Sequence, residues 1–351
     1  MSFDPEDDDM ELDDAVNEMP RPSFAQTLEA LRNGAATGLT ATVYYGLSDL
    51  ETSQLAELQP VWETLDTDYR ARLLEELVDT SETNSELDYV TLAFFGIEDS
   101  DAAVRAAAVE LLWVDESLQG LRALLKLAFE DDSALVRARA ASGLGKYILL
   151  GELDDLPETQ TSAAVDTCLA LFRDDDEDIE VRRRALESLG NSSRDGVAET
   201  IEEAYNSHEP HFKIGAVFAM GRSYDEMWAP IVLHELNSPD PELRYEAARA
   251  AGEIGIEDAV PKLSRMTHEP DRDIREVAIW ALGEIGGKEA ARVLQQLLDD
   301  PAYAIDEALI ETLEDALVSA TMPGDDLLFG EDYDDSDAEY DDPRGRASRW
   351  N

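Results

Sequence analysis

The sequence has little cysteine, no long apolar run and no secretory signal. Cys168 is the single cysteine in 351 residues, so no disulfide can form within the chain, and the cytoplasm is the expected compartment. The acidic N-terminus has the wrong charge for a signal peptide. The longest apolar stretches, such as residues 89–97, fall far short of the ~20 residues that a membrane span needs. We therefore expect a soluble, cytoplasmic protein that does not associate with membranes.

Basic residues are also scarce, with 28 Lys and Arg against 80 Asp and Glu, a formal charge of −52. Residues 1–20 contain nine acidic and no basic residues, and residues 325–342 contain ten and none. The part between them, 21–324, still has 61 acidic and 25 basic residues, a charge of −36. Such a field repels phosphate groups, so direct binding to nucleic acid is not expected. Solubility and a basic protein partner both remain explanations of the charge.

What the sequence does contain is a repeat. A basic residue recurs at intervals of 32, 45, 31, 31 and 31 residues, at Arg105, Arg137, Arg182, Lys213, Arg244 and Arg275. An apolar residue precedes each of them and an alanine follows three positions later. A glycine follows eight positions after five of the six, and Trp113 replaces it in the first unit. A sustained period of this length is typical of helical-repeat solenoids.

Each unit has the pattern of a helical hairpin. Asp, Ser and Pro before the basic residue supply N-caps for a first helix, A, whose apolar stripe must face a core. The alanine allows close helix approach, and the glycine suits either a helix end or close packing. Pro230 and Pro261 are expected in the first turn of the second helix, B. One hairpin cannot bury its own apolar face, so the pattern predicts an all-α superhelix of stacked hairpins.

The boundaries follow from where this pattern weakens. Residues 21–94 are predicted to form a helical N-terminal cap with a divergent first repeat around Arg70, and residues 95–322 the repeats and a C-terminal cap. The 45-residue interval predicts a prolonged helix A. Residues 1–20 and 323–351 lack the apolar content to fold alone and are predicted to be disordered.

Two units in particular, "DPELRYEAARAAGEIG" and "DRDIREVAIWALGEIG", resemble HEAT repeats of the bacterial phycobilisome-lyase-like type. The resemblance covers about residues 95–318 and implies an α–α superhelix. It also implies that the repeated basic residue is structural and bonds to acidic residues or carbonyls at the repeat junctions. The family includes scaffolds, chromophore lyases and a di-iron hydroxylase, so the resemblance alone does not select a function.

The resemblance to that hydroxylase, deoxyhypusine hydroxylase, implies His-Glu pairs directly after the basic residue. None of the equivalent pairs in this sequence contains histidine. His208, His234 and His268 each precede a glutamate, but they lie out of register, in loops before helix A or within helix B. Carboxylates alone do not reproduce an N/O iron site. We therefore expect no metal, no cofactor and no catalytic residue.

A candidate binding strip comes from the positions one and five residues after the basic residue, which are expected to face outward. In one unit these are Arg183 and Glu187, an expected solvated pair. In the next three units the candidates for partner binding are Ile214, Phe218, Tyr245, Arg249 and Trp280. The alternative is that helix A is rotated and the rings fill gaps between repeats.

The acidic C-terminal segment "DDLLFGEDYDD" contains three further candidates for partner binding, Leu327, Leu328 and Phe329. An acidic-hydrophobic pattern suits a short recognition segment that orders on a partner or on its own solenoid, and the alternative is an inert solvating tail.

Taken together, these features predict a non-enzymatic scaffold or adaptor for protein partners, with a basic partner as one candidate. Two alternatives remain open at this point. One is a family enzyme, either a metal-dependent hydroxylase or a phycobilin-type lyase, and the other is an acidic chaperone or mimic for a basic partner.

Overall fold

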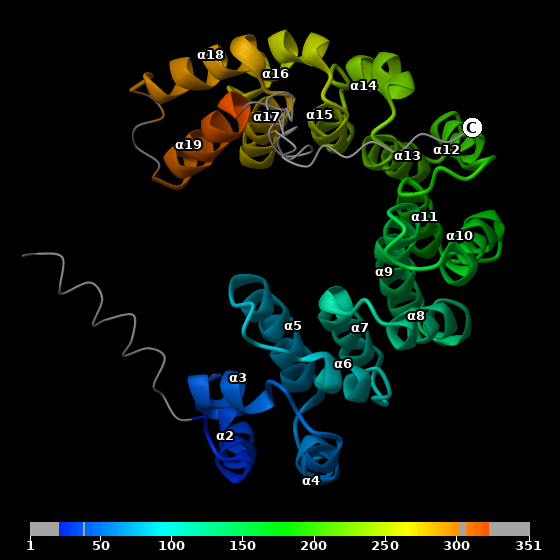
Figure 1. Ribbon diagram of the computed structural model, residues 1–351, viewed down its shortest axis with the longest axis vertical. Helices are drawn as coiled ribbons and strands as arrows, with labels where there is room; N and C mark the ends of the chain where they lie inside the picture. Colours follow the sequence, from blue (N-terminus) through cyan, green and yellow to red (C-terminus); the bar gives the residue numbers. More distant parts are fainter. Residues whose placement is uncertain (1–20, 38, 302, 304–306, 323–351) are drawn as a thin grey trace, which may run out of the picture.

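The computed structural model describes residues 21–322 apart from 38, 302 and 304–306. Within these residues the chain contains eighteen α-helices, α2 to α19, and no strand (Figure 1). The predicted all-α fold is confirmed. The predicted disordered tails lie outside the described residues.

The helices alternate between an inner and an outer row. The inner helices are α5 (Thr67–Thr83), α7 (Ala102–Leu111), α9 (Ala134–Glu152), α11 (Ile179–Leu189), α13 (Pro210–Arg222), α15 (Pro241–Ile254), α17 (Arg272–Ile285) and α19 (Glu307–Thr321). The outer helices are α6 (Val90–Gly96), α8 (Leu118–Glu130), α10 (Glu158–Arg173), α12 (Val197–Tyr205), α14 (Ala229–Glu235), α16 (Val260–Met266) and α18 (Gly287–Leu298). At the N-terminal end lie α2 (Phe24–Thr37), α3 (Ala41–Leu47) and α4 (Thr52–Trp62). Short 3₁₀ turns at Leu112–Val114, Glu226–Trp228 and Glu257–Ala259 lead into three of the outer helices.

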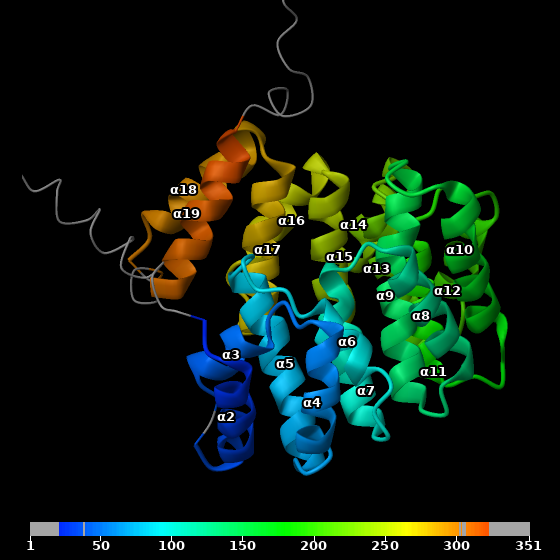
Figure 2. The same cartoon turned by 60° about the horizontal axis from the view of Figure 1, so that its bottom comes forward.

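The two rows form an open arc, with α2 to α4 at one end and α19 at the other (Figure 1). Each inner helix packs against the inner helices before and after it, and Figure 2 shows the helices standing side by side along the arc. The helix A segments predicted from the repeat are the inner helices, so their outward face is the concave side of the arc. The helix B segments lie on the convex side.

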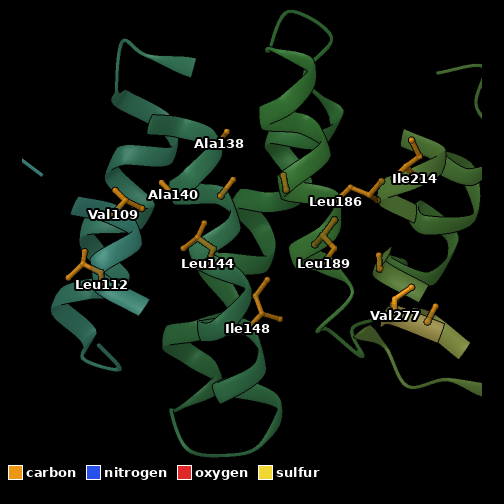
Figure 3. Close-up of a cluster of buried hydrophobic side chains, with 14 of the residues drawn as sticks. Val109, Leu112, Ala138, Ala140, Leu144, Ile148, Leu186, Leu189, Ile214 and Val277 are labelled. Atoms are coloured by element: carbon orange, nitrogen blue, oxygen red, sulfur yellow. The ribbon is translucent and has the colours of Figure 1, made fainter. Parts of the chain in front are cut away.

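One apolar core runs through the array. Figure 3 shows it passing from Val109 on α7 through Leu144 on α9 and Leu186 on α11 to Ile214 on α13. The alanine of every repeat is fully buried in this core, at Ala108, Ala140, Ala185, Ala216, Ala247 and Ala278. The role predicted for the small residue, close approach of neighbouring helices, is confirmed.

The repeated basic residue ties each inner helix to the loops around it. The Arg105 Nη1 group donates to the carbonyl oxygen of Asp99 at 3.0 Å, and its Nε group donates to the carboxylate of Asp131 at 2.8 Å. Arg244 repeats the arrangement, with Nη1 to the Ser238 carbonyl at 3.0 Å and Nη2 to Glu269 at 2.8 Å. Side chains of the same position in other units bond in a related way, namely Arg137, Arg182, Lys213 and Arg275. The predicted structural role is confirmed.

The divergent first repeat around Arg70 stays a prediction. The Arg70 Nη1 group donates to Asp99 at 2.6 Å, and the Arg70 residue is only 9% exposed. The prolonged helix in the 45-residue interval is α9, with nineteen residues. Pro230 and Pro261 lie in the first turns of α14 and α16, as expected.

The repeated glycines are sites of close helix packing. A methyl group at Gly190 would lie 2.6 Å from the carbonyl oxygen of Ala219 and 2.7 Å from its Cα atom, so α11 and α13 touch there through their backbones. Gly221 and Gly252 make similar approaches to Ala250 and Ala281. Close packing is therefore observed at these glycines, and Gly190 also has the other expected role, because it is the C-cap of α11.

Cys168 is completely buried, and burial raises the pKa of its thiol to about 12. The thiol therefore remains protonated at neutral pH, and Cys168 of α10 belongs to the apolar core. None of the helices in the described part of the chain has the length and apolar character that crossing a membrane requires.

Added salt is expected to stabilise this fold. Residues 21–324 carry a charge of −36, and self-repulsion of that size opposes the compact state. Because the Debye length falls from about 10 Å at 0.1 M to about 3 Å at 1 M ionic strength, the urea midpoint of unfolding should rise over that range. NaCl and KCl should act equally if screening is the cause. A midpoint that stays constant or falls would contradict this expectation.

Candidate protein-binding site

A groove of about 500 Å³ lies between the first turns of the neighbouring inner helices α15 and α17. Its lining consists of Pro241, Glu242, Tyr245, Glu246, Asp271, Asp273, Ile274, Glu276 and Val277. Five of these nine residues are carboxylic and none is basic. Tyr245 supplies the one aromatic ring. The groove therefore offers negative charge and a ring face at one place.

Most of the carboxylates that line the groove also bond to groups outside its lining. Asp271 is an exception, because it caps α17 by accepting a hydrogen bond at 3.0 Å from the backbone N–H of Asp273, which also lines the groove. Glu276 accepts from the Arg272 Nε group at 2.6 Å, in a pair that is largely exposed on both sides. Exposed pairs of this kind contribute little to stability and exchange readily with other partners.

Glu246 is the deepest carboxylate of the groove, with 9% of the residue exposed. Its Oε2 atom accepts a hydrogen bond from the Arg249 Nε group at 2.9 Å. Burial raises the pKa of Glu246 above its ordinary value of 4.5, Arg249 lowers it, and the nearby Glu187 carboxylate raises it further. Burial is the largest of these causes, so the pKa of Glu246 stays above its ordinary value although Arg249 and Arg183 both lower it.

Arg249 itself is held inside the array. Its guanidinium lies over the ring of Phe218, 3.9 Å from the ring centroid, and its Nη1 group donates to Glu253 at 2.6 Å. The side chain is 16% exposed. Burial also raises the pKa of Glu253 above its ordinary value, so Arg249 lies between two buried carboxylates that both depend on it.

The predicted outward strip is wrong at Ile214. This residue is 4% exposed and belongs to the core in Figure 3. An inner helix packs against neighbouring inner helices on both sides. Its solvent-facing surface is therefore too narrow to hold both of the positions that were expected to face outward. Phe218 is half-buried beneath Arg249. Its ring fills a gap between repeats, which was the alternative interpretation of this position.

Tyr245 and Trp280 do reach the inner face. Tyr245 is half-buried and lines the groove, whereas Trp280 is 37% exposed and its ring packs beside Gly252 of α15. The structure therefore brings Tyr245 into the groove and leaves Trp280 next to it on α17. Leu327, Leu328 and Phe329 lie outside the described residues, and their role in partner binding stays a prediction.

The expected solvated pair of Arg183 and Glu187 is also wrong, because their side chains are 12% and 5% exposed. Arg183 crosses α13 and its Nη2 group donates to Glu242 of α15 at 2.9 Å. The crossing is open because Gly215 of α13 has no side chain, and a methyl group there would lie 3.2 Å from the Arg183 Cγ atom. Arg183 of one helix thus pairs with a carboxylate of the groove lining two inner helices away.

Sequence reasoning missed the acidic lining of the groove. Its signal was the spacing of Glu242, Glu246, Arg249 and Glu253 at steps of four, three and four residues, which places four charged side chains on one face of a helix. That pattern identifies a charged inner face on α15 where an apolar strip was expected.

A second pocket of about 340 Å³ lies between α5, α7, α8 and α9, where Trp113 replaces the repeat glycine. Trp113 donates from Nε1 to the Ser81 hydroxyl at 2.9 Å. The Lys146 Nζ group donates to the carbonyl oxygens of Leu112 at 3.1 Å and Trp113 at 2.7 Å, and burial lowers its pKa. Lys146 is therefore already bonded to backbone carbonyls, and the other cation of the pocket, Arg139, pairs with Glu110 at 2.8 Å.

The three histidines that precede glutamate lie where the sequence placed them, His208 and His268 in loops before inner helices and His234 in α14. All three are exposed. Among residues 21–322 as described, no three side chains of the His, Cys, Asp or Glu type come together in a way that could hold a metal ion.

Comparison with known proteins identifies the type of repeat in this architecture. A family model of HEAT repeats matches residues 229–314, the segment that contains the groove. No curated protein matches the chain in sequence. The fold is an α–α superhelix of stacked hairpins. Residues 229–314 thus carry HEAT repeats, and the resemblance seen in the sequence is confirmed.

Several solved structures are similar at low identity. The complex of CpcE and CpcF of phycocyanin lyase from a Nostoc species has 19% identity and a TM-score of 0.43, over 66% of this chain and 94% of that one. Human deoxyhypusine hydroxylase has 18% identity and a TM-score of 0.30, over 69% and 98%. Importin beta has 15% identity and a TM-score of 0.39, over 89% of this chain and 43% of its own. At this distance the likenesses bear on neither activity nor partner.

Proposed function

We propose that this protein is a non-enzymatic scaffold whose concave face binds a basic segment of a partner protein. HEAT repeats generally mediate protein binding, because stacked hairpins present an extended and rigid surface. The observation that carries the proposal is the α15–α17 groove, which combines five carboxylates with the face of Tyr245 and has no basic residue in its lining. Such a site suits cationic side chains of a protein and repels phosphate.

The charge of the whole chain favours the same class of partner. A field from a net charge of −52 increases the rate at which a cationic segment meets the surface, and salt screens this attraction. The groove adds short-range contacts to that long-range attraction. Cation–π contact with a tyrosine ring contributes about 0.5–1 kcal/mol at an exposed site and more when desolvated.

The proposal predicts selective binding of basic peptides. Calorimetric titration with a peptide of alternating arginine and serine should show binding that weakens steeply between 0.1 and 0.5 M NaCl, and a matched glutamate–serine peptide should not bind. Replacing Tyr245 by alanine should weaken binding by about five-fold, since it removes the ring face. Absence of binding by the arginine peptide at 0.1 M NaCl would contradict the proposal.

A matched variant separates binding from stability. Phe218 lies beneath Arg249 and outside the groove lining, so Phe218→Ala should lower the unfolding midpoint while it changes peptide affinity less than Tyr245→Ala does. The opposite ranking would show that the groove is not the binding surface.

A further inference from the structure

A cleft of about 330 Å³ lies at the C-terminal ends of three consecutive inner helices, α9, α11 and α13. It shares no residue with the α15–α17 groove. Two arginines line it, Arg194 from the loop after α11 and Arg222 from the last turn of α13. The apolar residues of its lining are Leu149, Val197, Ala198, Ile201 and Trp228. The cleft therefore combines an apolar wall with two guanidinium groups.

Tyr224 also lines the cleft, in a backbone conformation that tyrosine rarely adopts. Its φ is 53°, in the left-handed region. In the next two repeats the same position, eleven residues after the basic residue, is occupied by Gly255 and Gly286, with φ of 77° and 65°. Glycine takes this conformation without steric cost, whereas a Cβ atom makes it unfavourable.

The packing of Tyr224 does not offset this backbone cost. The residue is 57% exposed, so burial of its ring contributes little to the stability of the fold. A strained residue whose ring stays in water, at the edge of a cleft, indicates a role for the ring in binding.

The carboxylates of the lining are already bonded to protein groups. Glu152 accepts from the backbone N–H of Ser193 at 2.9 Å and from the Ser193 hydroxyl at 2.5 Å. Asp225 accepts from the backbone N–H of Met227 at 2.9 Å. These two acidic side chains are therefore occupied in holding the loop after α11 and the turn after α13.

The two arginines are bonded less firmly. Arg222 donates from Nη2 to the Asn191 side chain at 3.3 Å and from Nη1 to Glu253 at 3.4 Å, and its side chain is 30% exposed. Hydrogen bonds of this length are weak. Arg194 pairs with Asp166 at 2.6 Å, but both side chains are largely exposed, and such pairs exchange readily with other partners. Both guanidinium groups can therefore bond to a ligand in the cleft.

We propose that this cleft binds a small aromatic carboxylate, whose carboxylate group pairs with Arg222 and whose ring stacks on Tyr224 beside the apolar wall. This second site goes beyond the proposed function, because it lies on other helices and takes a ligand of the opposite charge.

A carboxylate suits the cleft better than a phosphate. A planar carboxylate matches the fork of a guanidinium through two parallel hydrogen bonds. A phosphate monoester carries up to two negative charges, and Glu152 and Asp225 of the lining repel the second one. The volume of about 330 Å³ lies near the lower end of the range of about 300–1,000 Å³ for ligand pockets, so the site fits a small molecule.

Calorimetric titration with phenylacetate tests the site directly. We expect saturable binding with a dissociation constant of about 0.1–1 mM, as for a ligand of about ten non-hydrogen atoms. Phenylacetamide keeps the ring without the charge, acetate keeps the charge without the ring, and phenyl phosphate has the second charge. Each of the three should bind at least about ten-fold more weakly, because each loses one of the proposed contacts or adds repulsion.

Replacing Tyr224 by glycine separates binding from stability. The substitution removes both the ring and the strained conformation, so it should weaken phenylacetate by about five- to ten-fold and raise the midpoint of thermal unfolding by about 1–3 °C. Tyr224→Asn, which tolerates the left-handed region, should weaken the ligand equally. A ring with a structural role would instead lower the midpoint when it is removed.

Arg292 of α18 provides the control for Arg222, since it is 64% exposed and does not line the cleft. After the unfolding midpoints of both variants are measured, Arg222→Gln should weaken phenylacetate by about ten-fold and Arg292→Gln by less than two-fold.

The remaining outcomes overturn distinct statements. Absence of saturable phenylacetate binding up to about 10 mM would overturn the site. Equal binding of phenylacetamide or of phenyl phosphate would overturn the choice of a carboxylate. Unchanged affinity in Tyr224→Gly, or equal weakening by the two arginine variants, would overturn the assigned residues. None of these results depends on whether the α15–α17 groove binds basic peptides.

Discussion

Replacing Arg249 by methionine is expected to cost the fold about 3–5 kcal/mol at neutral pH, the range for removing one partner of a buried ion pair. Arg249 bonds to Glu246 at 2.9 Å and to Glu253 at 2.6 Å, and both carboxylates are largely buried. Methionine keeps apolar contact with the Phe218 ring. The loss of unfolding free energy therefore reports mainly the uncompensated charges of Glu246 and Glu253. Urea unfolding followed by circular dichroism measures it.

The cost of the Arg249 substitution should depend on pH in one direction. Arg249 lowers the pKa values of Glu246 and Glu253, although burial leaves both above their ordinary value of 4.5. A partner that lowers a carboxylate pKa contributes stability at high pH, and this contribution is lost as pH falls through the pKa of the folded state. The difference between the variant and the original protein should therefore be largest near pH 8 and should shrink as pH approaches 4.5.

Arg139 provides the control for this substitution. It pairs with Glu110 at 2.8 Å on the same row of inner helices, but its side chain is 46% exposed and that of Glu110 is 36% exposed. Arg139→Met should cost less than about 1 kcal/mol, as for other exposed pairs. Equal losses in the two variants, or a loss at Arg249 that does not change with pH, would contradict the interpretation of Arg249 as a buried counter-ion.

The second large effect is expected at the contact between α11 and α13. A methyl group at Gly190 would lie 2.6 Å from the Ala219 carbonyl oxygen and 2.7 Å from the Ala219 Cα atom, so Gly190→Ala requires the two helices to move apart. Overpacking of this kind costs about 1–3 kcal/mol. The shift should propagate along the arc, because each inner helix packs against the next.

Gly215 of α13 is the matched control, since it faces α11 across the same contact. The nearest atom to a methyl group there is the Cγ atom of the flexible Arg183 side chain, at 3.2 Å. Alanine also gains about 1 kcal/mol of helix propensity over glycine. Gly215→Ala should therefore change stability by less than about 1 kcal/mol. If thermal unfolding ranks the two glycines in the opposite order, the close approach at Gly190 is not what holds α11 and α13 in place.

The fold followed from the sequence because its determinants are local and repeated. The basic residue, the alanine and the glycine each keep a fixed position relative to one helix, and their roles as loop clamp, core residue and packing site depend only on that helix and its neighbour. Arg105, Ala108 and Gly190 show this directly. Short helices without the repeat pattern, such as α3 and α6, were not anticipated.

The candidate site could be predicted from the sequence only in part. Which residues reach the concave face depends on how each inner helix is rotated against its neighbours. A difference of a few tens of degrees decides whether Ile214 faces solvent or the core, and helical spacing alone does not fix that angle. The sequence pattern identified Tyr245 but not the neighbouring Glu246, because the strip that it predicted was mainly apolar. The ion pair between Arg183 and Glu242 depends on Gly215 in the intervening helix and on the curvature of the arc. Neither can be recognised from the sequence of a single repeat.

That same bond has a consequence for how the arc can bend. Arg183 and Glu242 lie on inner helices on either side of α13, and the outer helices cover the opposite side, so the bond acts as a tie across the inside of the curve. Straightening the arc at α13 lengthens the distance that the tie spans and breaks it. Because Glu242 also lines the groove, this bond connects the curvature of the arc at α13 to one side of the groove.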